Sequence, residues 1–76
     1  MIAVALVGCG RIAQRHAALL GGNQIAGMKL AAVCDVVEAR AAELARKHGV
    51  PAFRDMHEMM KTVRPDVVSV LTPSGL

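Results

Sequence analysis

Aromatic residues are almost absent: the 76-residue chain has no Trp, no Tyr and one Phe. This scarcity excludes an aromatic-rich binding module. Hydrophobic residues still make up 54% of the sequence, and they are chiefly Ala, Val and Leu. Such a composition is typical of helices packed on a sheet. A chain this short forms at most one small domain and buries only about 60–65% of its unfolded surface, so we expect a thin margin of stability.

Cysteines are also few, and long apolar runs are missing. Two cysteines, Cys9 and Cys34, are too few for the disulfide framework of a small secreted protein, and their spacing fits no metal or redox motif. No run approaches the roughly 18 apolar residues of a membrane span. The apolar N-terminus has no basic flank and no cleavage signature of a signal peptide. We therefore expect a cytoplasmic protein in a reducing compartment, with no membrane partner.

Charge of one sign is not concentrated anywhere along the chain. The net charge is +3, and the nine basic residues are scattered and have no aromatic partners. Nucleic-acid interfaces need clustered cations, so we expect no nucleic-acid partner.

Three continuous apolar runs are present, at 2–7, 30–34 and 67–71. Runs without alternation are typical of strands buried on both faces, as in parallel sheets. Ala52-Phe53 is a candidate for one further, very short strand.

Helical spacing separates these runs. Residues 11–20 form one helical pattern, with Ile12, Ala13, His16, Ala17 and Leu20 on one side. Residues 37–48 form a second pattern, which presents Val37, Ala41, Leu44, Ala45 and His48 and stops at Gly49. The third helix is capped by Asp55, with Glu58 three residues later, and ends at Arg64-Pro65. Its apolar stripe, expected to pack on the sheet, is Met56, Met59, Met60 and Val63.

Alternating strands and helices predict an α/β fold. We expect the first half of a doubly wound parallel sheet, Rossmann-like, with strand order 3-2-1-4 and helices on both faces of a three-layer sandwich. The sheet would end at the fourth strand, whose edge would be open. Open edges pair with other chains, so we expect self-association through this edge.

A glycine turn joins the first strand to the first helix. Gly8-Cys9-Gly10-Arg11-Ile12-Ala13 fits the pattern G-x-G-x-x-(G/A). The first glycine makes the tight turn, and the second lets a pyrophosphate approach the backbone. The third small residue lets helix and sheet pack closely. Amide groups at the helix start and the helix dipole favour an anion there. The alternative is a structural turn without a ligand.

An acidic residue follows the second strand at the spacing that this interpretation requires. Asp35 lies 22 residues after Ala13, close to the spacing of about 20 for the acid that binds a ribose. A carboxylate there accepts hydrogen bonds from the ribose hydroxyls and repels a 2′-phosphate, which favours NAD. Arg40 could tolerate the phosphate, so NADP stays open. The alternative role of Asp35 is to cap the helix 37–48, and the two roles are compatible.

The runs VGCGRIAQRH, AAVCD, HGVP and PDVVSVLTPSGL together resemble the Gfo/Idh/MocA oxidoreductases over essentially the whole chain. That family passes hydride between NAD or NADP and a hydroxyl of a sugar, nucleotide-sugar or cyclitol. The ending TPSGL looks most like members that act on nucleotide-activated N-acetyl sugars. The resemblance implies that the cofactor is bound by Gly8, Cys9, Gly10, Arg11, Ile12, Asp35, Leu71, Thr72 and Pro73.

The family's E-K-P lysine and its second, mostly β domain are not in these residues. We therefore interpret 1–76 as the N-terminal part of a dinucleotide-binding domain, truncated before the catalytic domain. The full-length parent would be an NAD(P)-dependent dehydrogenase, and the piece alone would be inactive, with no catalytic residue. The rival interpretation is an NAD(H)-sensing regulatory or structural domain without catalysis.

The remaining candidate residues favour structural roles. His16 could be a base, but its spacing with Ile12 and Leu20 favours a packed, hydrogen-bonded histidine. His48 and His57 are expected at a helix end and on the surface, and no histidines are spaced as metal ligands. Cys9 and Cys34 follow or end adjacent strands and could form a redox switch, although buried packing is favoured.

Overall fold

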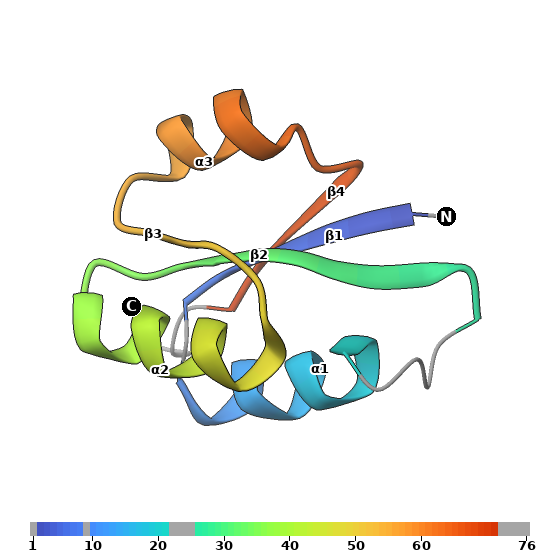
Figure 1. Cartoon of the computed structure of the whole chain (residues 1–76), viewed down its shortest axis with the longest axis horizontal. Helices are drawn as coiled ribbons and strands as arrows, with labels where there is room; N and C mark the ends of the chain where they lie inside the picture. The colour runs from blue at the N-terminus through green and yellow to red at the C-terminus, as the bar shows by residue number, and fades with distance from the viewer. Residues whose placement is uncertain (1, 9, 22–25, 72–76) are drawn as a thin grey trace.

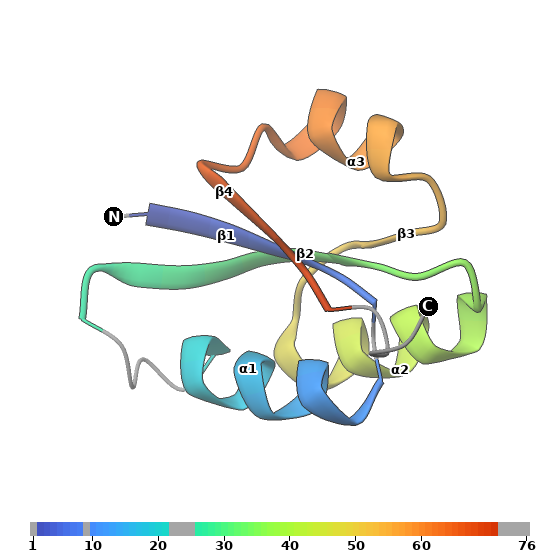
Figure 2. The same cartoon turned by 180° about the vertical axis from the view of Figure 1, so that it is seen from behind.

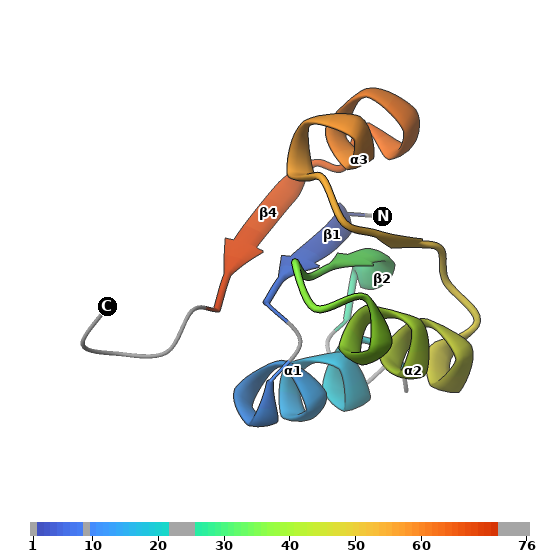
Figure 3. The ribbon, with the colours of Figure 1, turned by 90° about the vertical axis from the view of Figure 1, so that its left-hand side faces the viewer.

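The computed structural model describes residues 2–8, 10–21 and 26–71. Four parallel strands form one sheet in the order β3-β2-β1-β4, as the sequence predicts. Helices α1 and α2 cover one face of the sheet and α3 covers the other, as Figures 1 and 3 show. The predicted α/β fold and strand order are confirmed. The elements along the chain are β1 (Ile2–Val7), α1 (Arg11–Gly21), β2 (Met28–Cys34), α2 (Glu38–His48), β3 (Ala52–Phe53), α3 (Met56–Val63) and β4 (Val67–Val70).

Four boundaries differ from the sequence-based expectation. Helix α1 ends at Gly21, one residue late. Strand β2 begins at Met28, two residues early, because Met28 pairs with Ile2, whose N–H donates to the Gly27 carbonyl at 2.7 Å. Helix α2 begins at Glu38, one residue late. Strand β4 ends at Val70, although the Leu71 N–H still donates to the Val7 carbonyl at 2.8 Å.

The apolar strands divide their side chains between two cores. Val4 and Leu6 of β1 pack under α1 and α2, whereas Ala5 between them packs on the α3 side. A register shift in the β1–β2 pairing after Val4 inserts one extra residue in β2. It therefore lets Leu30 and Ala32, two residues apart, face opposite cores.

The helix ends follow the predicted signals. Gly49 stops α2 in the left-handed conformation, with φ of 66°. The Asp55 carboxylate caps α3 and accepts a hydrogen bond from the His57 N–H at 2.8 Å. Arg64 closes α3 in the left-handed region (φ 51°), and its N–H donates to the Met60 carbonyl.

Not every predicted helix face is buried. In α3, Met59 is fully buried and Val63 is partly buried, but Met56 and Met60 are exposed. The predicted methionine stripe is therefore half wrong, because a two-turn helix on one side of the sheet buries only a narrow strip. In α2, Ala41, Leu44 and Ala45 are buried as predicted, but Val37 precedes the helix and is 43% exposed. His48 is half-buried at the helix end, and His57 is exposed, as predicted.

Candidate dinucleotide site

The carboxyl ends of three strands meet at one edge of the sheet. The Gly8 N–H donates to the Cys34 carbonyl at 2.7 Å, which joins the end of β1 to the end of β2. On the other side of β1, the Leu71 N–H donates to the Val7 carbonyl at 2.8 Å. These two bonds bring Gly8, Asp35 and Leu71 to the same edge. The strands β1, β2 and β4 that lead to it can be followed in Figure 2. Ligands of doubly wound sheets bind at this edge, where the strand order reverses.

The two glycines of the turn differ in what the fold requires of them. Gly8 has φ of 96°, a conformation that a side chain strains, so the turn itself needs glycine. Gly10 has no positive φ, and a Cβ built on it meets no atom of the described residues within 4 Å. The described residues therefore leave open space beside Gly10. This is the position where the sequence predicts that a pyrophosphate approaches the backbone.

The start of α1 suits an anion. The Gln14 N–H donates to the Gly10 carbonyl at 3.1 Å, so the helix begins directly after Gly10. The first N–H groups of a helix have no acceptor within it. The first turn of α1 contains no acidic residue that would repel a negative ligand. The backbone of Gly10 and Arg11 therefore lies at the start of this helix, and their part in binding a cofactor stays a prediction. The Arg11 and Ile12 side chains are not described.

Asp35 lies directly after β2 and is buried, with 9% of its surface exposed. Its N–H donates to the Phe53 carbonyl at 3.0 Å, which fixes its backbone against β3. One carboxylate oxygen, Oδ1, accepts a hydrogen bond from the Val37 N–H at 2.8 Å. This bond from the backbone two residues later closes an Asx turn and orients the carboxylate.

The alternative role considered for Asp35, the cap of α2, is not the one seen in the structure. The residue in the cap position is Val37, and no side chain caps that end of the helix. Asp35 instead holds the turn that leads into the helix, because three residues lie between the end of β2 at Cys34 and the first helical residue, Glu38. Arg40 is exposed on α2 and lines a small hollow with Gln14 and Glu43.

Cys34 precedes Asp35 and is buried at the end of β2. Burial raises the pKa of its thiol, and the charges of Asp35 and then Asp55 raise that pKa further. A raised pKa disfavours the reactive thiolate, which favours packing over a redox role for Cys34. Its proposed redox partner, Cys9, lies outside the described residues.

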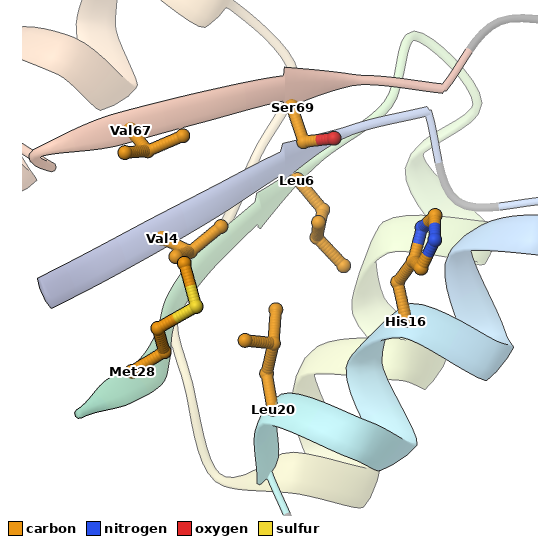
Figure 4. Close-up of a pocket in the computed structure, with 7 residues that line it drawn as sticks. All are labelled: Val4, Leu6, His16, Leu20, Met28, Val67 and Ser69. Atoms are coloured by element: carbon orange, nitrogen blue, oxygen red, sulfur yellow. The ribbon is translucent and has the colours of Figure 1, made fainter. Parts of the chain in front are cut away.

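His16 lines an apolar pocket between α1 and the sheet, with a volume of about 200 Å³ (Figure 4). It is half-buried, and its Nδ1 atom is buried with no hydrogen-bond partner among the described residues. The packed histidine is thus confirmed, but the predicted hydrogen bond is not made at Nδ1. No sequence pattern indicates this pocket, because its walls come from four separate elements: Val4, Leu6, His16, Leu20, Met28, Val67 and Ser69.

Two predicted site residues, Thr72 and Pro73, lie outside the described residues, as Cys9 does. Within the part of the chain that the structure describes, no group of His, Cys, Asp and Glu side chains could hold a metal ion. In that same part, no helix has the length and apolar character needed to cross a bilayer.

Comparison with known proteins decides the family. Residues 2–76 match the model of the Gfo/Idh/MocA oxidoreductase family, described as an NAD-binding Rossmann fold. The chain belongs to this family. Over these residues it is an NAD-binding Rossmann domain, which confirms the resemblance seen in the sequence and the predicted cofactor.

Individual relatives agree with this assignment. The chain is 37% identical over 73 residues to D-glucoside 3-dehydrogenase of Escherichia coli K12, covering 93% of this chain and 20% of that protein. Scyllo-inositol dehydrogenase of Lactobacillus casei, solved with NAD(H) and scyllo-inositol, has a TM-score of 0.85 at 31% identity, covering 100% of this chain and 22% of that one. The WlbA dehydrogenase of Chromobacterium violaceum, solved with NADH and UDP-GlcNAcA, has a TM-score of 0.85 at 35% identity, covering 99% and 21%. The chain therefore spans about a fifth of the length of these relatives.

Proposed function

We propose that these residues are the N-terminal part of the cofactor-binding domain of an NAD-dependent dehydrogenase. The dehydrogenase would move hydride between the nicotinamide and a hydroxyl of a sugar, nucleotide-sugar or cyclitol. The observation that carries this proposal is the meeting of Gly8, Asp35 and Leu71 at one sheet edge beside the open space at Gly10. The relatives are dehydrogenases, which favours an enzyme over the rival sensing domain.

Each described residue has a distinct part in holding the dinucleotide. The backbone of Gly8, Gly10 and Arg11 would surround the pyrophosphate at the start of α1. The Asp35 carboxylate, oriented by the Val37 N–H, would accept hydrogen bonds from the ribose hydroxyls. Leu71 would contact the cofactor at the end of β4. The resemblance adds Cys9, the Ile12 side chain, Thr72 and Pro73 to this set.

The bound nicotinamide supplies the hydride acceptor or donor, and the protein orients it. We propose that the groups that hold and move the hydroxyl proton belong to the rest of a longer protein, so that residues 1–76 alone bind cofactor weakly and turn nothing over. The proposed substrate class is supported by the relatives, which include a glucoside, a cyclitol and a nucleotide-sugar dehydrogenase. A cytoplasmic location fits the buried thiol of Cys34 and the small number of cysteines.

The test is calorimetric titration with NADH and NADPH of the chain and of Asp35→Asn. The asparagine keeps an oxygen that can accept the Val37 hydrogen bond but removes the charge. A hydrogen bond to a charged group contributes roughly 1.5–3 kcal/mol, so NADH should bind about ten- to a hundredfold more weakly to the variant. The preference for NADH over NADPH should shrink as well, because the repulsion of the 2′-phosphate is lost.

Glu43→Gln is the matched control, since it removes one negative charge from the exposed face of α2. It should leave both affinities unchanged. Gly10→Ala tests the pyrophosphate position: its Cβ meets no described atom, so the fold should persist while cofactor binding is lost. Equal affinities for NADH and NADPH, unchanged in Asp35→Asn, would remove Asp35 from its role. Full binding by Gly10→Ala would show that the pyrophosphate lies elsewhere.

A further inference from the structure

A cation lies next to the position proposed for the ribose. The Asp35 N–H donates to the Phe53 carbonyl at 3.0 Å, so the end of β3 runs beside the turn that follows β2 (Figure 1). Arg54 comes directly after Phe53, and consecutive Cα atoms are about 3.8 Å apart. The backbone therefore places Arg54 beside the Asp35 turn, on the side away from Gly8.

The side chain of Arg54 is paired with an acid of the neighbouring helix. Its Nη1 atom lies 3.7 Å from Oε2 of Glu38, the first residue of α2. The ion pair therefore joins the end of β3 to the start of α2, across the turn formed by residues 35–37. The acid next to Arg54 in sequence, Asp55, is engaged at the cap of α3, where its Oδ1 accepts the hydrogen bond from the His57 N–H.

This ion pair is weak and open to solvent. The two side chains are 71% and 73% exposed, and their separation of 3.7 Å is longer than the roughly 2.7–2.9 Å of a charge-assisted hydrogen bond. Water screens such a pair, so Glu38 holds Arg54 with little free energy. Val36, inside the turn, is 84% exposed, so a ligand has access to this side of the turn. A stronger anion within reach of Arg54 competes with Glu38 for its guanidinium.

NADP carries such an anion and NAD does not. The 2′-phosphate of NADP is attached to the ribose that Asp35 would bind, and a phosphomonoester has a charge of about −1.5 to −2 at pH 7. A guanidinium binds phosphate through two parallel hydrogen bonds, a geometry that the long contact with Glu38 lacks. Arg54, once released from Glu38, is therefore suited to bind the 2′-phosphate.

Arg40 is the other cation to be considered for this phosphate. Successive residues of a helix are turned by about 100°, so Arg40 and Glu38 lie on different sides of α2. Arg40 lines a small hollow with Gln14 of α1 and with Glu43. Its side of α2 therefore faces α1, whereas Glu38 is the residue that reaches the end of β3.

We propose that Glu38 is a specificity-determining residue, which keeps Arg54 from the 2′-phosphate and so favours NADH over NADPH. This inference rests on the proposed function, because it takes Asp35 as the acceptor for the ribose. Glu38 acts in two ways: it occupies the guanidinium of Arg54, and its own charge repels the phosphate. Asp35 acts on the phosphate by repulsion alone. The two carboxylates therefore exclude NADP by different means, and the part of Glu38 that depends on Arg54 can be measured separately.

The test is calorimetric titration with NADH and NADPH of the parent chain, Glu38→Gln, Arg54→Gln and the double variant. The readout is the ratio of the two affinities. In Glu38→Gln, NADPH should bind about fivefold more tightly, while the affinity for NADH should stay within about twofold. Arg54→Gln alone should change the ratio little, because Glu38 already occupies the guanidinium. The double variant should lose most of the gain, so the two substitutions should not be additive.

Glu43→Gln is the matched control, because it removes the same charge from an exposed position of the same helix. It should leave the ratio unchanged. Phosphorus NMR gives a second readout: the signal of the 2′-phosphate should shift when NADPH binds Glu38→Gln and should shift much less with the double variant. The substituted side chains are all exposed, so circular dichroism should show every variant folded.

Three results would overturn this inference. An equal gain from Glu38→Gln with and without Arg54 would show that Glu38 acts through its own charge only. An equal gain from Glu43→Gln would point to Arg40, which shares a hollow with Glu43. An unchanged ratio in Glu38→Gln, with NADH still bound, would remove the role of Glu38 and leave the proposed function intact. Failure of the parent chain to bind either dinucleotide would instead remove the proposed function, and this inference with it.

Discussion

The two faces of the sheet are built differently. The face under α1 and α2 has a core of leucines and valines contributed by two helices and two strands. The face under α3 has a core of small sheet residues, and one long side chain, Met59, fills the space above them. The first core contains Val4, Leu6, Ala17, Leu20, Leu30, Val33, Ala41, Leu44 and Ala45, and the second contains Ala5, Ala32, Cys34 and Met59.

This difference teaches where the stability of a small domain is concentrated. On the first face, no single side chain dominates, because several leucines interlock and each has large neighbours. On the second face, the small residues Ala5 and Ala32 let α3 approach the sheet, and Met59 is the one buried residue of α3. The packing of α3 on the sheet therefore depends mainly on one residue, whereas the packing of α1 and α2 is shared among several.

Met59→Ala should cause the largest loss of stability among the substitutions that test this difference between the two faces. Removing a fully buried Met leaves a cavity over Ala5 and Ala32 and should lower the free energy of unfolding by about 3 kcal/mol. We expect amide exchange in α3 to become fast before the rest of the chain unfolds. Urea denaturation followed by circular dichroism gives the first quantity, since the chain has no Trp, and hydrogen exchange gives the second.

Leu44→Ala is the matched change on the other face, where Leu44 is 3% exposed. We expect a smaller loss, about 2 kcal/mol, because Leu20, Leu30 and their neighbours can close part of the cavity. Exchange in α2 should then rise together with that of the whole chain. If Leu44→Ala cost more than Met59→Ala, or if α3 stayed protected without Met59, the contrast between the faces would be wrong.

Much of this architecture could be predicted from the sequence. Apolar runs without alternation, such as Ile2–Val7, indicate strands buried on both faces, and Gly49 and Asp55 are local signals that end and begin helices. These features depend on residues close in sequence. The same is true of the glycine turn, where the φ of 96° at Gly8 follows from the short link between strand and helix.

What could not be predicted depends on residues far apart in sequence. Which methionines of α3 face the sheet is decided by how far the helix overlaps β2, and a stripe of four cannot reveal that only Met59 is fully buried. The pocket at His16 needs walls from α1, β1, β2 and β4 together. The role of Asp35 in the turn before α2, rather than at the helix cap, depends on where the helix starts, and sequence patterns place such boundaries poorly.

A smaller effect should come from the cap of α3. Asp55→Ala removes the acceptor of the His57 N–H and should destabilise the chain by about 1 kcal/mol. Because α3 packs on the sheet mainly through Met59, the loss of stability should appear as faster amide exchange in α3. Asp55→Asn keeps a side-chain oxygen as acceptor and should recover most of the stability. An equal loss in both variants would assign the effect to the charge of Asp55 instead of the cap.

The smallest expected effect is a gain at the start of α2, on the opposite face. Val37 occupies the cap position with φ of −88° and ψ of 99°, an extended conformation suited to a capping residue, yet no side chain caps the helix. Val37→Ser would supply an acceptor for the first free amides of α2, and little apolar burial is lost because Val37 is 43% exposed. We expect the free energy of unfolding to rise by about 0.5 kcal/mol in urea denaturation. Val37→Ala is the matched control and should give no gain. A serine variant no more stable than the alanine variant would show that the Asp35 turn already meets the needs of this helix end, and that α2, unlike α3, gains nothing from a side-chain cap.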